Sequence, residues 1–357
     1  MSSPRIWLVM GDKPGDNAQL EIVAEALGLP VERRRVIPRS EWVLGKPRVE
    51  ASLAHLDPLK SDPLEPPWPD LVLTIGRRPS MAALWIQEQS GGRTRLVLFG
   101  PPKRYPERYS LIVAPAQYRL GHAGNSLPIR FPLMRSNAAG IASARAEWET
   151  RLAELPRPIT ALLVGGQTKP YRLDAAVARE LMKSASELAS PGTLYVSTSR
   201  RTPPAAVAAI ESALPPGARL FRWAPEAPDN PYLALLALAE RFIVTGDSIS
   251  MMVEVARLGR PLLIAPLPYR SPMAGFSHRW VNRPDGLPAR LRAMGITRGA
   301  RDLGELHRVL VEEGFARLLS AGFPPPSAAG LADDLPRVVD AIRALLGPPG
   351  RASSAQL

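Results

Sequence analysis

Cysteine is absent from this 357-residue sequence, and its absence excludes several kinds of site. The chain can have no disulfide framework, no thiolate nucleophile and no cysteine-ligated metal. It also has no run of 18 apolar residues, so we expect no transmembrane helix. The first residues lead directly into an apolar segment and lack the apolar core and cleavage site of a signal peptide. These absences predict a cytoplasmic protein.

Motifs that mark common nucleotide and metal sites are missing as well. Neither GxxxxGK[ST] nor GxGxxG occurs, which excludes a Walker A loop and the usual dinucleotide fingerprint. No DxD triplet occurs, which favours chemistry without a divalent metal, and we predict neither a metal site nor a cofactor. No long basic run and no RNP-like aromatic motif is present, so nucleic acid is not an expected partner.

What the sequence does have is a surplus of positive charge. Lysine and arginine together number 45, against 33 aspartates and glutamates, which gives a net charge of +12. Such a surface attracts nucleotides and anionic lipid headgroups. A peripheral association with the inner membrane, or with a lipid-linked acceptor, is therefore part of the prediction.

Short apolar segments alternate with amphipathic ones along most of the chain, which is typical of an α/β fold with parallel sheets. The segments expected as strands are 6–10, 31–37, 70–75, 95–99 and 111–113, followed by 159–164, 193–197, 220–223, 242–244 and 262–265. Loops are expected over 38–69, 114–137 and 269–290.

The run Pro156-Arg157-Pro158 separates the two sets of strands and predicts a domain boundary. We therefore expect an N-terminal domain over 1–155 and a C-terminal domain over 156–330, both Rossmann-like. Residues 331–357 are expected to form a helix, which packs back on the N-terminal domain, and a disordered tail.

The segment 241–267 is the clearest strand–turn–helix–strand unit of the sequence. Ligands bind at the carboxyl ends of parallel strands, and the N–H groups of a helix start suit a phosphate. The polar side chains placed there are Thr245, Asp247, Ser248, Ser250 and Glu254. An alternative remains open, because aspartate and serine before a helix are ordinary N-caps, although capping does not explain Glu254.

Two earlier strands of the same half also end in small, amide, hydroxyl or cationic groups. The residues concerned are Gly165, Gly166, Gln167 and Lys169 after one strand, and Ser199, Arg200 and Arg201 after the other. The carboxyl ends of parallel strands share one edge of the sheet. Three such turns on one edge predict a pocket for a nucleotide diphosphate, because structural caps do not explain the paired arginines.

In the first half, a glycine-bearing loop follows the strand 6–10 and is either a structural turn or the lining of a cleft. The residues expected to line the cleft are Gly11, Gly15 and Gln19, and those expected to present a base are Asp12 and Asp16. Arg77 and Arg78 follow the strand 70–75. This pair either lines the cleft and holds an anion, for which we select Arg77, or forms a solvated turn.

Six runs of the chain resemble the elongated-mitochondria fission-protein family, which is shared by bacteria and plants. They are GDKPGDNAQ (11–19), GRRPS (76–80), GGQTKPY (165–171), TSRRTP (198–203), NPYLALLALAE (230–240) and TGDSISMMVEV (245–255). The likeness covers roughly residues 5–320. That family is in turn similar to the glycosyltransferase-B superfamily, which includes the lipid-linked N-acetylglucosaminyltransferase of peptidoglycan synthesis and the non-hydrolysing nucleotide-sugar 2-epimerases.

The resemblance implies two Rossmann-like domains that face each other across a cleft, with a nucleotide-sugar donor mainly on the C-terminal domain. The ribose-binding acid of the superfamily matches Glu254. The phosphate loop of the superfamily matches Asp247, Ser248 and Ser250. Its glycine pair matches Gly165 and Gly166.

The leading hypothesis is a metal-independent transfer of a sugar from a nucleotide diphosphate to an envelope or lipid-linked acceptor. Helix-start N–H groups at 248–250 and a guanidinium of Arg200 or Arg201 would stabilise the charge of the leaving diphosphate. Asp12 or Asp16 would be the general base for the acceptor. Two alternatives remain: a nucleotide-sugar epimerase on the same fold, and a non-catalytic peripheral membrane adaptor.

Overall fold

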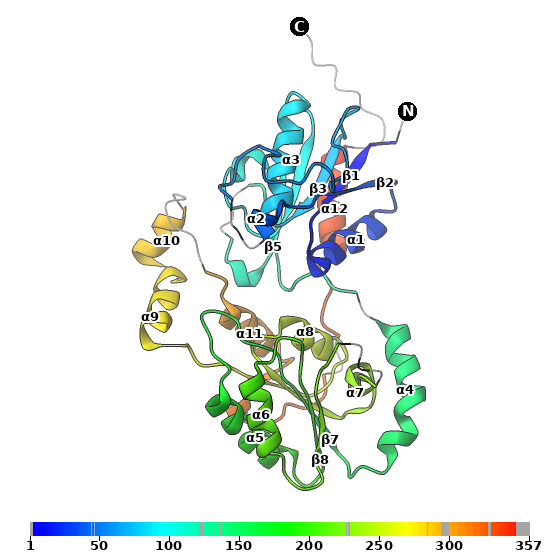
Figure 1. The fold of residues 1–357 in the computed structure, drawn as a ribbon, viewed down its shortest axis with the longest axis vertical. Coiled ribbons are helices and arrows are strands. Elements are labelled where there is room, and N and C mark those ends of the chain that lie inside the picture. Colours follow the sequence, from blue (N-terminus) through cyan, green and yellow to red (C-terminus); the bar gives the residue numbers. More distant parts are fainter. Residues whose placement is uncertain are drawn as a thin grey trace. The chain divides into compact units, whose positions relative to one another are not determined.

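The structure is a computed structural model that divides into two compact units, each built around its own sheet (Figure 1). Unit 1 comprises Met1–Arg135 and Asp333–Leu357, and unit 2 comprises Ser136–Ala332. The residues described are 3–43, 45, 47–120, 124–135, 137–225, 227, 229–283, 285–293, 300–327 and 330–347. The tail predicted to be disordered lies outside these residues.

Unit 1 contains a six-stranded parallel sheet in the order β2-β1-β3-β4-β5-β6. Its strands are β1 (Ile6–Met10), β2 (Val31–Arg35), β3 (Leu71–Ile75), β4 (Arg95–Phe99), β5 (Leu111–Pro115) and β6 (Ser126–Ile129). Its helices are α1 (Pro14–Leu27), α2 (Ser40–Val43), α3 (Arg77–Gln89) and α12 (Leu335–Leu346), with 3-10 turns η1 (Pro106–Arg108) and η2 (Ala116–Tyr118).

The central strands of unit 1 are apolar on both faces, so helices cover both sides of the sheet. Successive side chains of a strand point to opposite faces. Ile6 and Leu8 of β1 accordingly join the core under α1 and α12, whereas Trp7 and Val9 join the core under α3. The C-terminal helix α12 therefore completes the fold of unit 1.

Unit 2 contains a second six-stranded parallel sheet, in the order β12-β11-β10-β7-β8-β9. Its strands are β7 (Ile159–Leu163), β8 (Thr193–Ser197), β9 (Arg219–Phe221), β10 (Arg241–Thr245), β11 (Leu262–Ala265) and β12 (Arg317–Leu318). Its helices are α4 (Ala138–Ala153), α5 (Ala175–Ala189), α6 (Pro204–Ser212), α7 (Tyr232–Leu238), α8 (Ile249–Arg257), α9 (Pro272–Val281), α10 (Gly286–Ala293) and α11 (Leu303–Glu312), with the 3-10 turn η3 (Leu319–Ala321). The predicted class, α/β with two Rossmann-like parallel sheets, is confirmed.

The structure divides the chain earlier than the predicted boundary at 155/156. Helix α4 packs against α7, buries Trp148 and Leu152, and donates a hydrogen bond from Arg145 to the carbonyl of Ala237 at 2.8 Å. These contacts attach α4 to unit 2 rather than to the predicted N-terminal domain. The proline run lies inside unit 2, between α4 and β7.

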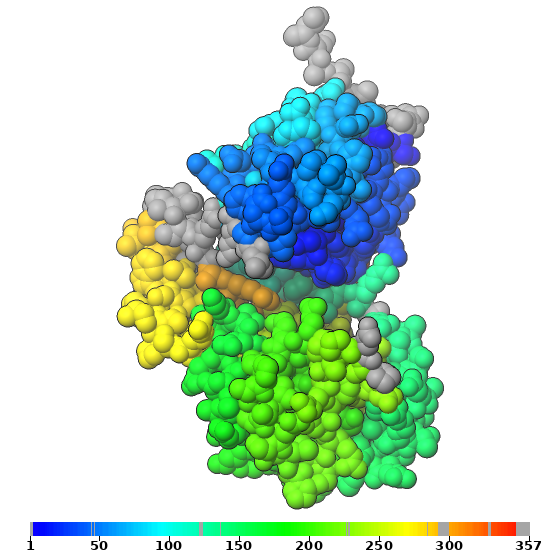
Figure 2. All heavy atoms as spheres, in the orientation of Figure 1, coloured from blue at the N-terminus to red at the C-terminus, as the bar shows by residue number. Residues whose placement is uncertain are grey.

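The described residues of segment 38–69 are irregular apart from the four-residue helix α2, whereas the other two segments predicted as loops contain longer regular elements, and those two predictions are wrong. Segment 114–137 includes the strand β6, and segment 269–290 includes the helices α9 and α10, whose atoms are coloured yellow in Figure 2. Strand β6 buries only Ile129, and the fully buried positions of α9 are Gly275 and His278. Strand β6 shows no apolar alternation, and the apolar spacing of α9, made by Met273, Phe276 and Trp280, faces solvent rather than the core.

Candidate functional site

The strand order of unit 2 places a ligand-binding position between β7 and β10. From β7 the chain proceeds outward to β8 and β9, then returns to the other side of β7 to form β10, β11 and β12. This is the classical Rossmann order, in which ligands bind at the carboxyl ends of the two strands where the order reverses. In unit 2 the loops at that point follow Leu163 and Thr245.

The Asp247 carboxylate joins these two loops, and its side chain is fully buried. One oxygen accepts a hydrogen bond from the Gly166 N–H at 2.7 Å, and the other accepts one from the Thr245 hydroxyl at 2.8 Å. The Thr245 hydroxyl in turn accepts a hydrogen bond from the Gly165 N–H at 2.8 Å. Burial raises the pKa of Asp247, and these hydrogen bonds partly offset that effect.

The loop after β8 is attached to the same point. Ser199 and Thr202 donate hydroxyl hydrogen bonds to the Gly165 carbonyl at 2.9 and 2.6 Å, and Arg201 approaches the Asp247 carboxylate at 3.3 Å. A Cβ atom at Gly166 would lie 2.4 Å from the backbone oxygen of Arg201, so only glycine fits this close approach. The three predicted turns therefore meet, as expected, at one edge of the sheet.

The start of α8 presents free polar groups at this edge. Ser248 occupies the N-cap position, but its side chain makes no capping hydrogen bond, and Asp247 is directed at the loop after β7. The capping alternative is therefore wrong for both side chains. Five of the predicted residues are exposed around the three loops: Gln167, Lys169, Arg200, Arg201 and Ser250.

Glu254 is half-buried one turn further along α8 and faces Tyr232 at the start of α7. The Tyr232 hydroxyl donates a hydrogen bond to one oxygen of the Glu254 carboxylate. Burial raises the pKa of Glu254, and the hydrogen bond from Tyr232 partly offsets that effect. One carboxylate oxygen is thus fixed by the protein, which orients the other.

Unit 1 contains a pocket of about 570 Å³ at the carboxyl edge of its own sheet. The strand order of unit 1 reverses between β1 and β3, and the loops after these strands line the pocket. Its polar lining residues are Asp12, Lys13, Asp16, Asn17, Gln19, Arg77, Arg78, Ser80, Lys103 and Gln117. Gly11 also lines it, whereas Gly15 is exposed and does not.

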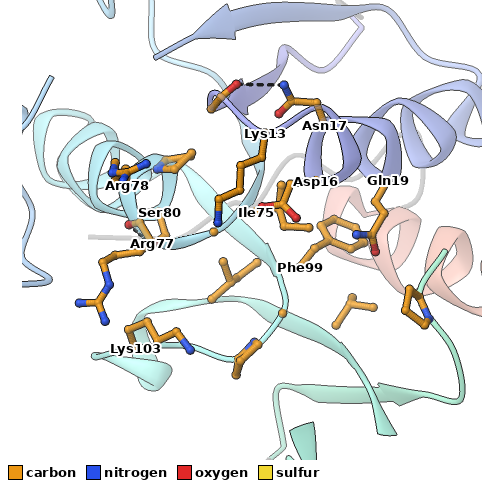
Figure 3. Close-up of a pocket in the computed structure, with 18 of the residues that line it drawn as sticks. Lys13, Asp16, Asn17, Gln19, Ile75, Arg77, Arg78, Ser80, Phe99 and Lys103 are labelled. Carbon is orange, nitrogen blue, oxygen red and sulfur yellow. Dashed lines mark hydrogen bonds between the residues drawn. The ribbon is translucent and has the colours of Figure 1, made fainter. Parts of the chain in front are cut away.

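The two predicted bases differ in environment within this pocket. Asp12 forms an ion pair with Arg78 at 3.3 Å and is the more exposed of the two. Asp16 is half-buried, and Figure 3 shows its carboxylate and the Lys13 side chain directed into the same space, with Lys103 on the opposite wall. Burial raises the pKa of Asp16, an effect that Lys13 partly offsets. The environment of Asp16 therefore favours the protonated form of its carboxyl group more than water does.

We expect Asp16→Asn to raise the thermal unfolding midpoint at pH 7. Because the folded state raises the pKa of Asp16, its ionised form costs stability above the pKa of the unfolded chain, about 4. The gain should therefore shrink as the pH falls and disappear well below about 4, where the carboxyl group is protonated in both states. Asp12→Asn is the matched control, since it removes an ion pair and should give no stabilisation. Equal unfolding midpoints for wild type and Asp16→Asn at pH 7 would show that the ionised Asp16 carboxylate does not destabilise the folded state.

Several residues of these sites were not selected from the sequence. Lys13, Asn17 and Lys103 line the pocket, and Asn17 Oδ1 is a buried atom without a hydrogen-bond partner among the described residues. Tyr232 belongs to the NPY run, but its partner lies 22 residues away in the sequence, so no local pattern indicates the contact.

Within the described part of the chain, no group of three or more His, Asp or Glu side chains is placed to hold a metal ion. In that same part, no helix has both the length and the apolarity needed to span a bilayer.

Comparison with known families gives one match that covers most of the chain. Residues 14–285 match the family described as Mitochondrial fission ELM1. The mitochondrial fission protein ELM1 of Arabidopsis thaliana is 23% identical over 239 residues, which cover 60% of this chain and 56% of that protein. The uncharacterized protein RP120 of Rickettsia prowazekii is 25% identical over 231 residues, which cover 55% and 64%. The matches thus span less than two thirds of either relative.

Solved structures similar to this chain have low sequence identity to it. A glycosyltransferase from Rickettsia africae is 10% identical, with a TM-score of 0.48 and coverage of 97% of this chain and 100% of that one. The UDP-GlcNAc 2-epimerase from Methanocaldococcus jannaschii is 11% identical, with a TM-score of 0.46 and coverage of 95% and 99%. Similarity at this level carries no information about ligand or reaction.

Proposed function

The chain belongs to the mitochondrial fission ELM1 family, and from the site geometry we propose that it binds a nucleotide-diphosphate sugar and transfers the sugar without a metal ion. The observation that carries the proposal is the junction of the loops after β7 and β10, where the strand order of unit 2 reverses. A preformed junction at that point suits a nucleotide, because its hydrogen bonds hold the loops in place before the ligand binds.

In this proposal unit 2 holds the donor. The diphosphate lies against the N–H groups at the start of α8, with the Ser250 hydroxyl and the Arg200 guanidinium beside it. Glu254 accepts hydrogen bonds from the ribose hydroxyls through the carboxylate that Tyr232 orients. Charge that develops on the leaving diphosphate is then met by groups that are already in position.

The acceptor belongs to the pocket of unit 1, with Asp16 as its general base. Four cationic residues, Lys13, Arg77, Arg78 and Lys103, outnumber the two acids there, which favours an anionic acceptor such as a lipid-linked phosphate. Asp16 takes the proton of the acceptor hydroxyl as the sugar–phosphate bond breaks. Asp12 keeps Arg78 in place through their ion pair.

A thermal-shift and calorimetric screen of nucleoside diphosphates and their sugar conjugates tests the donor site. At about 100 times its Kd a ligand should stabilise the folded protein by about 2.7 kcal/mol. If no nucleotide of the screen binds at millimolar concentration, the proposal is contradicted and the non-catalytic adaptor alternative is favoured.

Product analysis with a bound nucleotide sugar then separates the two enzymatic alternatives. If the sugar is converted into its epimer in the absence of an acceptor, the protein is an epimerase and the proposed transfer activity is wrong. In the transferase, Asp16→Asn should abolish turnover and leave nucleotide affinity unchanged, because the proposed base belongs to the other unit.

A further inference from the structure

The helix α9 of unit 2 is held in place by polar and small residues rather than by an apolar core. His278 hydrogen-bonds to the Arg301 carbonyl at 3.0 Å and to the Tyr269 hydroxyl at 3.3 Å. Gly275 packs so closely on the Tyr269 ring that a Cβ atom there would lie 2.9 Å from it. The Ser271 hydroxyl caps the helix by accepting a hydrogen bond from the Ala274 N–H at 3.2 Å. The orientation of α9 is therefore fixed by its inward face.

The opposite face of α9 exposes large apolar side chains to solvent. Met273, Phe276 and Trp280 are 71%, 61% and 36% exposed, and Leu287 at the start of α10 is 61% exposed. These four make up half of the eight large apolar side chains that the described residues expose, yet they lie within 15 positions of the sequence. The spacings of three and four between the residues of α9 place them in one stripe along the helix. We call these four residues the apolar stripe.

Positive charge borders the apolar stripe. The segment 270–290 contains four arginines and one aspartate, a local surplus of three positive charges. All four arginines are exposed, and they are Arg270, Arg279, Arg283 and Arg290. Arg270 precedes the N-cap of α9 and Arg283 follows its C-cap, so the exposed arginines stand before, within and after the helix that carries the stripe. Exposed cations therefore stand at both ends of the exposed apolar line.

We propose that the apolar stripe and its bordering arginines form the surface by which this protein binds an anionic membrane. Tryptophan, phenylalanine and leucine on one helix face enter the boundary between headgroups and acyl chains, and arginines beside them bind anionic headgroups. The charge complementarity favours a lipid surface over a protein partner, since a protein would need an acidic groove of matching length. This surface is separate from the residues proposed to bind nucleotide, so either proposal can fail alone.

Co-sedimentation with vesicles of phosphatidylserine and phosphatidylcholine tests the proposal with the full chain. Met273→Ser/Phe276→Ser changes the two most exposed residues of α9, and it should lower the partition coefficient about ten-fold or more. Leu59→Ser is the matched control, because Leu59 is 95% exposed in unit 1 and its change should have no effect. Binding should also fall as salt rises, and Arg279→Ala should weaken it about five-fold, whereas Arg179→Ala should not.

Quenching of tryptophan fluorescence by brominated acyl chains tests the same contact by an independent measurement. Wild type should be quenched on binding, and Trp280→Phe should lose that quenching while still binding. Absence of binding to anionic vesicles at low salt, or equal binding of Met273→Ser/Phe276→Ser and wild type, would overturn the proposal. A purified protein partner that binds wild type and not that variant, with no vesicle binding, would assign the surface to protein recognition instead.

Discussion

Asp247→Ala is expected to lower the stability of unit 2 by about 2–4 kcal/mol, because two buried donors lose their acceptor. The Gly166 N–H and the Thr245 hydroxyl both donate to this carboxylate, at 2.7 and 2.8 Å, and its side chain is fully buried. Arg201 loses its ion pair as well, but its side chain is 48% exposed and keeps its hydrogen bond to the Thr168 hydroxyl, so this loss adds little.

Hydrogen exchange in denaturant measures this effect locally, which matters because a chain with two units need not unfold in one step. Peptides from β7 and β10 should lose protection, while those from β1 and β3 in unit 1 should keep it. Ser250→Ala removes an exposed hydroxyl from the same turn and should change stability by less than about 0.5 kcal/mol. Unchanged protection in Asp247→Ala would show that the junction of the loops does not depend on this carboxylate.

Glu254→Gln is expected to raise the Kd of a nucleoside diphosphate ten- to hundred-fold. A carboxylate that accepts hydrogen bonds from two ribose hydroxyls in a half-buried position contributes about 1.5–3 kcal/mol. The fold should be little affected, because the glutamine oxygen can still accept the hydrogen bond from Tyr232. Calorimetric titration of wild type and variant gives the ratio of affinities directly.

Two controls separate ribose binding from a purely structural role of Glu254. A 2′-deoxy nucleotide should be affected less by Glu254→Gln, since one of the two hydroxyls is already missing. Tyr232→Phe removes the orienting hydroxyl and keeps the charge, so it should cost about 1 kcal/mol in stability and weaken binding less than Glu254→Gln. Equal affinities of wild type and Glu254→Gln for a ligand that binds wild type would remove Glu254 from the site.

The predicted strands show where sequence reasoning succeeds. Strands β1, β3, β7 and β10 are short runs of apolar residues that are buried on both faces, so their identity depends on local composition. Parallel strands then align their carboxyl ends without further information. The meeting of Gly165, Ser199 and Thr245 at one edge could therefore be predicted before any coordinates were known.

The failures have a common physical cause. Strand β6 buries only Ile129 and shows no alternation, whereas the apolar spacing of α9 is limited to Met273, Phe276 and Trp280 and lies on its exposed face. Helix α4 has a recognisable sequence, but its assignment to unit 2 depends on contacts of Trp148 and Arg145 with residues far along the chain. A pattern in the sequence indicates that a side chain will be buried, and not which partner will bury it.

The sequence by itself determined the two parallel sheets, the turns that carry polar groups and the excess of positive charge, because these depend on residue types and their spacing. Only the tertiary structure decided what each polar group does. Asp247 became a buried connector between loops rather than a helix cap, and Asp16 rather than Asp12 was left without an ion pair among the described residues. The pKa and the hydrogen-bonding capacity of a side chain depend on neighbours from distant segments, and folding alone brings those neighbours together.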